Sequence, residues 1–269
     1  MLFPHVRTPK CGIAHFDTDS GAFLLVLEDL DTSHCIPISI NIHHEAALRT
    51  AARLHAAQIP KNCGPLPLTP VHLHLGPMVE DYLKESWAKV QTMYLDLDST
   101  TKDLIELLCQ NSVYTNLLQD LAQPPHSLIH GDFRPSNLKF HSHLKQVIVF
   151  DWQFISLASP AYDFAYYLGL ALTVNQRRTM EEDLKRAYID ERLLAGDIYF
   201  AQLDNQSRFF NHDIQVGVLI SLASFVIGAA SAKNYTLHHR SITNLATAAL
   251  DWNALTLLKE DVYSSRLPR

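Results

Sequence analysis

Three polar residues in the middle of the chain are spaced so that their side chains could meet at one site. Asp132 and Asn137 lie in the segment His-Gly-Asp-Phe-Arg-Pro-Ser-Asn, and Asp151 follows fourteen residues after Asn137. Two apolar runs, 138–140 and 147–150, flank a short polar segment and predict a hairpin. The first strand would begin just after Asn137 and the second would end at Asp151. The hairpin would therefore bring the three side chains together at one of its ends.

Two carboxylates and an amide in this arrangement have the chemistry that phosphoryl transfer requires. Asp132 would take up or orient the proton of an attacking hydroxyl. Carboxylate and amide oxygens are ligands that Mg²⁺ accepts alongside water, so Asn137 and Asp151 would hold the metal against a triphosphate. Arg134, two residues after Asp132, could reach the transferring phosphate with its guanidinium. We therefore predict Asp132 and Arg134 as catalytic residues, and Asn137 and Asp151 as metal ligands.

The pattern His-Gly-Asp-x-x-x-x-Asn followed by Asp-Trp resembles the catalytic and metal-binding loops of a known family. This is the aminoglycoside/choline phosphotransferase superfamily, small-molecule kinases whose fold is similar to that of protein kinases. A His-Gly-Asp tripeptide alone arises readily by chance and usually marks a turn. Its fixed spacing to Asn137, Asp151 and Asp163 makes chance a poor explanation. The flanks resemble the choline/ecdysteroid-kinase-like (CHK-like) branch through Asp151-Trp152-Gln153, the Tyr-Asp-Phe-Ala-Tyr-Tyr-Leu segment at 162–168, and Arg177, Arg178, Glu181, Glu182 and Tyr188.

The resemblance implies an α+β, protein-kinase-like fold. Residues 1–30 would be the remnant of an N-terminal lobe, with its last strands and the hinge. Residues 31–269 would be a mostly helical C-lobe that carries a small catalytic β-hairpin and the metal-binding loop. ATP and Mg²⁺ would be the cofactors, and a small-molecule alcohol would be the substrate. Asp163 would support the catalytic loop by binding its backbone near His130, although a helix N-terminus also favours an acidic residue there.

Residues 12–16 and 23–27 are predicted to form two strands, the second of them an apolar run expected to be buried. The second run leads into Glu28, Asp29 and Leu30. In the resembled family such a segment is the hinge between the lobes, and its backbone N–H and C=O groups pair with the edge of adenine. The resemblance therefore implies that Glu28, Asp29 and Leu30 bind the nucleotide.

The chain departs from the family before this hinge. Kinases of this fold place a Gly-rich phosphate loop, a strand lysine and a helix glutamate there. Only 27 residues precede Glu28, and we find none of these elements among them. Three alternatives stay open: an active kinase with a reduced lobe, a catalytically weak or inactive kinase-like binding protein, and a fragment of a longer kinase.

Apolar residues at helical spacing predict several helices after the hinge. A helix rich in charged residues is predicted at 178–195. Arg177, Arg178 and Glu181 at its start are expected to be exposed to solvent, with ion pairs between neighbouring turns. His55 is interpreted as a histidine packed in its helix. Asp98 or Ser99 would cap the helix predicted at 100–122. The predicted helices span residues 41–57, 76–96, 100–122, 178–195 and 242–262, and a proline-rich loop spans 60–70.

The most apolar run, 214–232, approaches the length of a membrane span. Asp213 and Lys233 bound it, and the sequence offers no second run of this kind. Because a helix that is apolar on all sides can lie in a core, we expect a buried C-lobe helix and no membrane partner.

Composition excludes several other classes of protein. The 269 residues are 47% hydrophobic and 19% charged, which is typical of a globular protein. A formal net charge of −6 argues against a general nucleic-acid binder. Four cysteines without a Cys-x-x-Cys pair and the lack of a secretory signal favour a reducing, cytoplasmic location. The histidine pairs, including His43-His44, lack a cysteine or carboxylate at ligand spacing and are expected at the surface.

Overall fold

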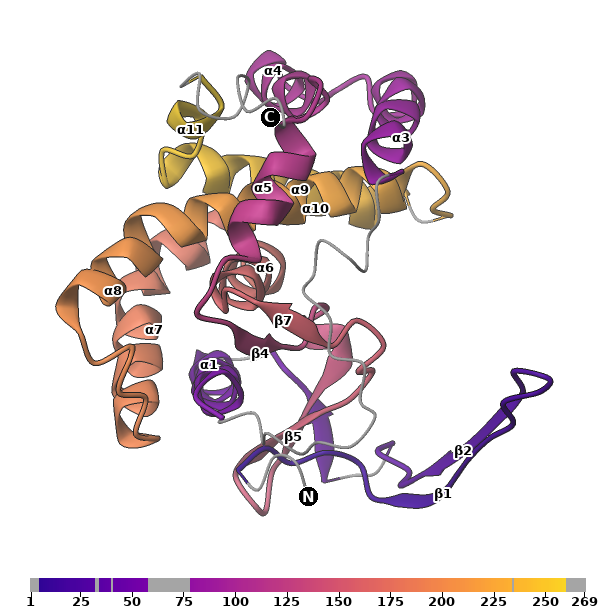
Figure 1. The fold of residues 1–269 in the computed structure, drawn as a ribbon, viewed down its shortest axis with the longest axis vertical. Coiled ribbons are helices and arrows are strands. Elements are labelled where there is room, and N and C mark those ends of the chain that lie inside the picture. Colours follow the sequence, from indigo (N-terminus) through magenta and orange to yellow (C-terminus); the bar gives the residue numbers. More distant parts are fainter. Residues whose placement is uncertain (1–4, 32–33, 40, 58–77, 234, 260–269) are drawn as a thin grey trace.

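The computed structural model describes residues 5–31, 34–39, 41–57, 78–233 and 235–259. These residues form an α+β structure in which helices make up most of the body and three small sheets lie toward one side (Figure 1). The predicted loop at 60–70 lies outside the described residues, as does the end of the last predicted helix.

The hairpin predicted from the apolar runs 138–140 and 147–150 is confirmed. Strands β5 (Leu138–His141) and β6 (Gln146–Val149) pair antiparallel, with Leu138 opposite Val149. A short strand that sequence reasoning missed, β3 (Cys35–Pro37), adds to the free edge of β5. A second missed pair, β4 (Ser127–Ile129) with β7 (Ser156–Ala158), brackets the hairpin in the sequence. Both ends of the predicted active-site segment are thereby fixed to a strand.

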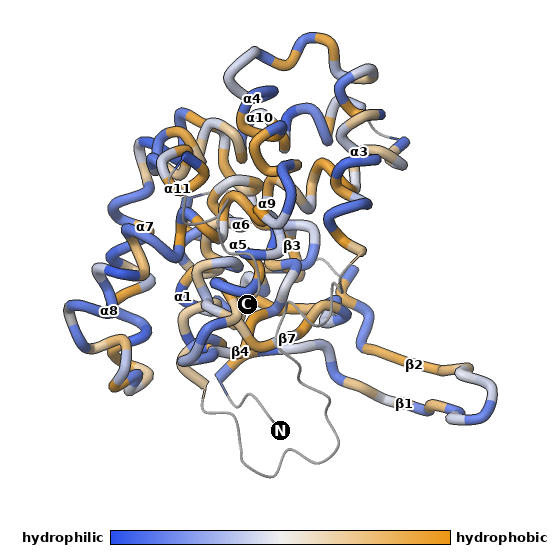
Figure 2. The backbone as a smooth tube through the Cα atoms, turned by 45° about the horizontal axis from the view of Figure 1, so that its top comes forward, coloured by the Kyte–Doolittle hydropathy of each residue, from blue (hydrophilic) through white to orange (hydrophobic). Residues whose placement is uncertain are grey.

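The two N-terminal strands form as predicted, but the expected burial of the second is wrong. Strands β1 (Cys11–Phe16) and β2 (Phe23–Leu27) pair antiparallel and extend from the body as an arm (Figure 1). Every residue of both strands is exposed, and Phe23 keeps 76% of its accessible surface. Within the described residues each strand has only the other as its sheet neighbour. The arm extends away from the helices (Figure 2). Its apolar side chains therefore stay in solvent.

The predicted helices form, with two of them divided. Helices α1 (Asn41–His55) and α3 (Val79–Met93) match their predictions. The third is wrong as a single helix, because the chain breaks between α4 (Ser99–Leu108) and α5 (Val113–Leu121), where Ser112 has a φ of 66°. Asp98 caps α4 by accepting a hydrogen bond from the Thr101 N–H at 2.8 Å.

The last predicted helix is divided in the same way. Helix α10 (Tyr235–Asp251) ends before Asn253, which has a φ of 59°, and α11 (Leu255–Lys259) follows. Ser112 is the N-cap of α5, and Asn253 lies between α10 and α11. A residue with a positive φ lies in each break, and an L-residue in that region cannot continue a right-handed helix.

The apolar run at 214–232 forms the central helix of the body, as predicted. Helix α9 (Ile214–Ala229) contacts α6 (Ala161–Ala171), α10, α3 and α5. Its approach to α6 is close, because a Cβ on Gly217 would lie 2.8 Å from the Ala161 carbonyl oxygen. In the described part of the chain, the helical run 204–229 is the one stretch long and apolar enough to cross a membrane, and 67% of its most apolar window is buried within the protein.

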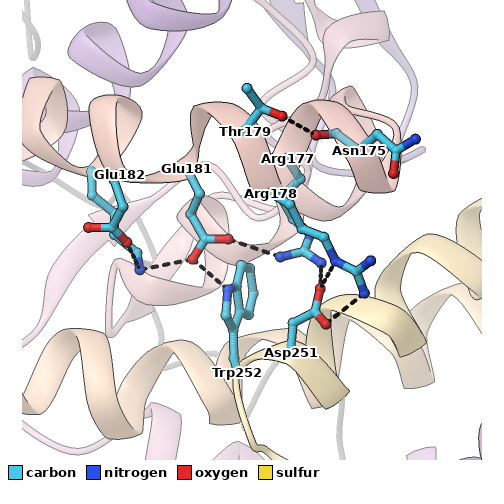
Figure 3. Close-up of polar contacts among 9 residues, drawn as sticks. Asn175, Arg177, Arg178, Thr179, Glu181, Glu182, Asp251 and Trp252 are labelled. Carbon is cyan, nitrogen blue, oxygen red and sulfur yellow. Dashed lines mark hydrogen bonds and ion pairs between the residues drawn. The ribbon is translucent and has the colours of Figure 1, made fainter.

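The expected exposure of the charged helix is wrong at two positions. Helix α7 (Val174–Leu194) buries Arg177 and Glu181, which form an ion pair with 2.9 Å between Nη1 and Oε2. Arg177 also pairs with Asp251 at the end of α10, and its guanidinium lies over the ring of Trp252 (Figure 3). The sequence showed the charges of α7 but not the C-terminus of α10 that covers them.

Histidines 43 and 44 are also buried rather than at the surface, each with 4% of its surface accessible. His44 forms a hydrogen bond of 2.9 Å between its Nδ1 and the Tyr167 hydroxyl, and His43 stacks on Phe140. Aromatic and phenolic partners from distant parts of the chain make this burial possible.

Candidate active site

Asp132 lies in the loop between β4 and the short 3₁₀ turn η1 (Pro135–Asn137), and it is almost fully buried. The Asn137 amide nitrogen donates to Asp132 Oδ2 at 2.7 Å and to the Asp132 backbone carbonyl at 2.9 Å. Arg134 Nε lies 3.0 Å from Oδ1, and the Tyr166 hydroxyl donates to Oδ1 at 2.8 Å. Three donors from three different residues therefore fix the orientation of this carboxylate.

Tyr166 is a member of the site that sequence reasoning missed. Burial raises the pKa of Tyr166 well above its ordinary value, so the phenol keeps its proton and acts as a donor to Asp132. Tyr166 and Asp163 are three residues apart on α6 and so lie on one face of the helix. That spacing was visible in the sequence and could have identified it.

The orientation of the Asn137 amide follows from its two bonds to Asp132. Both partners are acceptors, so the amide nitrogen must face them. Its Oδ1, which has a 3.4 Å contact with the Ser136 hydroxyl, is then the atom that can accept a cation. An amide oxygen is a ligand that Mg²⁺ accepts.

Asp151 stands at the same end of the hairpin as Asn137. The Phe150 N–H donates to the Asn137 carbonyl at 3.1 Å, which continues the β5–β6 pairing by one step. Asp151 then turns out of the strand with a φ of 65° and exposes its side chain. The described residues contain no cluster of three or more histidines, cysteines or carboxylates that could hold a metal. One amide and one carboxylate fit a Mg²⁺ ion that takes its other ligands from phosphate and water.

Asp163 binds the backbone of residues 130–137, the predicted catalytic loop. Its carboxylate is inaccessible to solvent and accepts the His130 N–H at 2.6 Å and the Gly131 N–H at 2.9 Å. His130 in turn bonds through Nε2 to the Phe150 carbonyl at 3.0 Å, so the loop is tied to β6 as well. These contacts connect α6, the loop and the hairpin, and they set where Asp132 lies.

Gly131 is required by the shape of this loop. Its φ is 82°, a region that L-residues adopt at a cost. A Cβ at this position would lie 2.3 Å from the carbonyl oxygen of Phe154, a distance that no real Cβ contact shows. The backbone of the catalytic loop therefore passes against 154 only because residue 131 has no side chain.

His55 is packed in its helix as predicted, but it also contacts the site. Its Nε2 lies 3.2 Å from Asp163 Oδ2, and its Nδ1 lies 2.7 Å from the Tyr188 hydroxyl. Burial lowers the pKa of His55, with Asp163 opposing the change. A neutral ring satisfies both contacts if Nε2 donates to Asp163 and Tyr188 donates to Nδ1. Helices α1 and α7 thus both support the residue that holds the catalytic loop.

The expected nucleotide-binding segment lies at the base of the arm. The Glu28 carboxylate pairs with Arg7 at 2.8 Å, and this hydrogen bond lowers the pKa of Glu28. The Glu28 N–H donates to the Lys10 carbonyl at 2.8 Å. Among the described residues, no hydrogen bond or ion pair joins 28–30 to the catalytic loop. The structure brings Asp132, Arg134, Asn137, His130 and Asp163 together. It connects Glu28 to β6 through Arg7, whose carbonyl accepts the Val149 N–H at 2.9 Å.

A cavity of about 540 Å³ opens beside Asp132 and Arg134. Its wall is built from α3, α5, α6 and α9 and is rich in aromatic rings. The buried carboxylate therefore faces a space large enough for a small organic molecule.

Comparisons with known proteins give the family and the fold. Residues 12–196 match the model of the phosphotransferase enzyme family. No curated protein matches the chain significantly. Among solved structures, a choline kinase from Cryptosporidium parvum is similar with a TM-score of 0.55 and 12% identity, over 96% of this chain and 76% of that one.

Two further structures show the same likeness. A choline/ethanolamine kinase family protein from Mesorhizobium loti gives a TM-score of 0.53 at 16% identity, over 94% of this chain and 78% of that one. A Plasmodium vivax ethanolamine kinase gives a TM-score of 0.51 at 12% identity, over 97% of this chain and 70% of that one. At these identities the likeness shows the fold, and it confirms the predicted protein-kinase-like α+β class; the CHK-like branch stays a prediction. Because the family model covers well over half of its length, the chain belongs to the phosphotransferase enzyme family.

Proposed function

We propose that the protein is a kinase that transfers the γ-phosphoryl group of ATP, with Mg²⁺, to a hydroxyl group of a small molecule. Membership of the phosphotransferase family supports a small-molecule kinase. The observation that carries the proposal is the Asp132 carboxylate, held by Asn137, Arg134 and Tyr166 at the wall of a cavity.

In this proposal Asp132 orients the acceptor hydroxyl and takes up its proton as the oxygen attacks phosphorus. The hydroxyl would replace one of the present donors, and Arg134 is the candidate because its side chain is 37% exposed. Once released from Asp132, the Arg134 guanidinium can turn to the transferring phosphate, where its planar donors match phosphate oxygens.

Asn137 Oδ1 and the Asp151 carboxylate would hold Mg²⁺. When bound, the metal neutralises charge on the phosphates. Asn137 then has two functions, because its nitrogen fixes Asp132 while its oxygen faces the cation. The amide of Asn137 would therefore link the base, Asp132, to the metal site.

Residues 1–30 would contribute the hinge and 31–269 the catalytic lobe. Because the Glu28 N–H is used by Lys10, the adenine edge would be read by the backbone of Asp29 and Leu30. The thiols of Cys11, Cys35 and Cys109 are free, which supports a reducing compartment such as the cytoplasm.

The test is a calorimetric titration of the 269-residue protein with ATP, with and without Mg²⁺. We expect binding that requires Mg²⁺ and that weakens strongly in Asp151→Asn. The matched control is Asp190→Asn, which neutralises an exposed carboxylate on α7 away from the site. An absence of binding at millimolar ATP, or equal binding by wild type and Asp151→Asn, would refute the proposal.

A second variant separates binding from chemistry. Asp132→Asn keeps the size of the side chain and removes the base, so ATP binding should persist. The release of ADP in the presence of an alcohol acceptor should fall by about 10²–10⁴-fold, which is the usual contribution of a general base.

A further inference from the structure

The cavity beside Asp132 has a wall of aromatic side chains. Tyr162 stacks on Tyr166 with 5.5 Å between ring centroids, and Tyr166 lies 5.8 Å from Phe225. Tyr82, Tyr114, Phe154 and His238 complete the aromatic part of the lining. The rings come from α3, α5, α6, α9, α10 and the loop after β6, so the cavity is formed only when these elements pack together.

The cavity wall carries one carboxylate, one guanidinium and one imidazole, from Asp132, Arg134 and His238. Asp132 is the only carboxylate among the described lining residues, and Arg134 is already 3.0 Å from its Oδ1. Burial raises the pKa of Tyr114 to about 12, so its phenol remains neutral. An amino sugar with several ammonium groups would find no other carboxylate on these walls. Burying such charges without partners is strongly unfavourable.

We infer that this cavity binds an uncharged alcohol with an apolar, ring-sized body, an inference that rests on the proposed kinase function. The hydroxyl lies at Asp132, and the apolar body lies against the rings of Tyr162, Tyr166 and Phe225. A volume of about 540 Å³ is within the range of pockets that hold drug-sized ligands. The apolar area removed from water would supply most of the affinity.

A quaternary ammonium alcohol is the competing ligand. Such a cation could lie over tyrosine rings, and it would gain from them without a carboxylate. The neutral alcohol is favoured because the guanidinium of Arg134 lines the same cavity and would repel a cation next to it.

Gly228, near the end of α9, provides a way to narrow the cavity without disturbing the fold. It lines the cavity, and a Cβ built on it would meet nothing within 4 Å. Its φ is not positive, and replacing a helix glycine by leucine raises helix propensity. Gly228 is itself exposed, so it lies at the rim of the cavity, and Gly228→Leu should fold normally and narrow that rim.

The experiment measures binding to the full chain without nucleotide, by calorimetry, using three probes. They are 2-(2-naphthyl)ethanol as the neutral alcohol, choline as the quaternary ammonium alcohol, and kanamycin as the amino sugar. We expect the naphthyl alcohol to bind most tightly. Gly228→Leu should weaken the binding of the naphthyl alcohol by at least about tenfold, because the added side chain competes with the ligand for the same space. Asn175→Leu, on the exposed side of α7, should leave this affinity unchanged.

Tighter binding of choline or kanamycin would overturn the inference, as would equal affinity of Gly228→Leu and wild type for the naphthyl alcohol. Titration of Gly228→Leu with Mg²⁺ and ATP distinguishes a failure of this inference from a failure of the proposed kinase function. If nucleotide binds normally and the alcohol does not bind to any variant, the inference fails while the kinase proposal stands. If the alcohol binds and nucleotide does not, the kinase proposal fails, and the cavity remains an alcohol-binding site.

Discussion

Arg177 and Arg178 are neighbours on α7 and bind the same carboxylate, Asp251, but only Arg177 is buried (Figure 3). Arg177 keeps 2% of its side-chain surface, against 53% for Arg178. Replacing each by methionine removes one charge from the same ion-pair cluster at two different depths. The pair therefore tests how far burial decides the contribution of an ion pair to stability.

The expected effect of Arg177→Met follows from its contacts. It loses charge-assisted bonds to Glu181 and Asp251 and the contact over Trp252. Removing one partner of a buried ion pair usually destabilises by about 3–5 kcal/mol. Here both carboxylates keep a cation, because Lys185 lies 2.8 Å from Glu181 and Arg178 still binds Asp251. We therefore expect the free energy of unfolding to fall by about 2–3 kcal/mol, at or just below the lower end of that range.

The assay is urea unfolding followed by far-UV circular dichroism, with thermal melts in parallel. A loss of this size corresponds to roughly 4–12 °C in melting temperature for a chain of this length. Arg178→Met should give a midpoint close to that of the wild type, because its ion pair is open to solvent and is screened there. Coincident unfolding midpoints for both variants would refute the argument from burial.

Three further outcomes are expected. Asp163→Asn should lower kcat more than it raises the KM for ATP, because an amide NH₂ would face the backbone N–H of His130 or Gly131 and shift the loop that carries the base; an unchanged kcat would contradict this. Gly131→Ala should destabilise the protein by at least about 1–3 kcal/mol through its positive φ, with the contact to Phe154 adding to this, as measured by urea unfolding. Burial lowers the pKa of His44 below its usual 6.5, so the unfolded chain binds a proton at a pH where the folded chain does not. Stability should therefore fall as the pH drops below about 6.5, and His44→Gln should show a smaller fall between about pH 7.5 and 5.5.

The candidate active-site segment was predictable because its geometry is local. The strands on either side of residue 142 are joined by a short turn, so their pairing follows from two apolar runs. That pairing places Asn137 opposite Phe150, the residue before Asp151. The contact between Asn137 and Asp132 spans five residues and was likewise within reach of spacing arguments.

The environment of these residues was not predictable, because it depends on which helices pack together. Tyr166 reaches Asp132 across 34 residues of sequence, and His55 reaches Asp163 across 108. Periodicity shows that a helix has an apolar face but does not say which partner covers that face. The same limit explains the exposed β2 strand, whose residues are apolar enough to be buried but have no covering layer in the described structure.

The sequence by itself determined the candidate active-site segment, the α+β class and most of the helices, since these depend on residue type and short-range spacing. Only the tertiary structure decided that Arg177 is buried and that Asp163 binds both the loop and His55. It also decided the aromatic cavity at Asp132. Each of these arises where elements distant in the chain meet, and burial there, rather than residue type, sets the strength of a charge or a hydrogen bond.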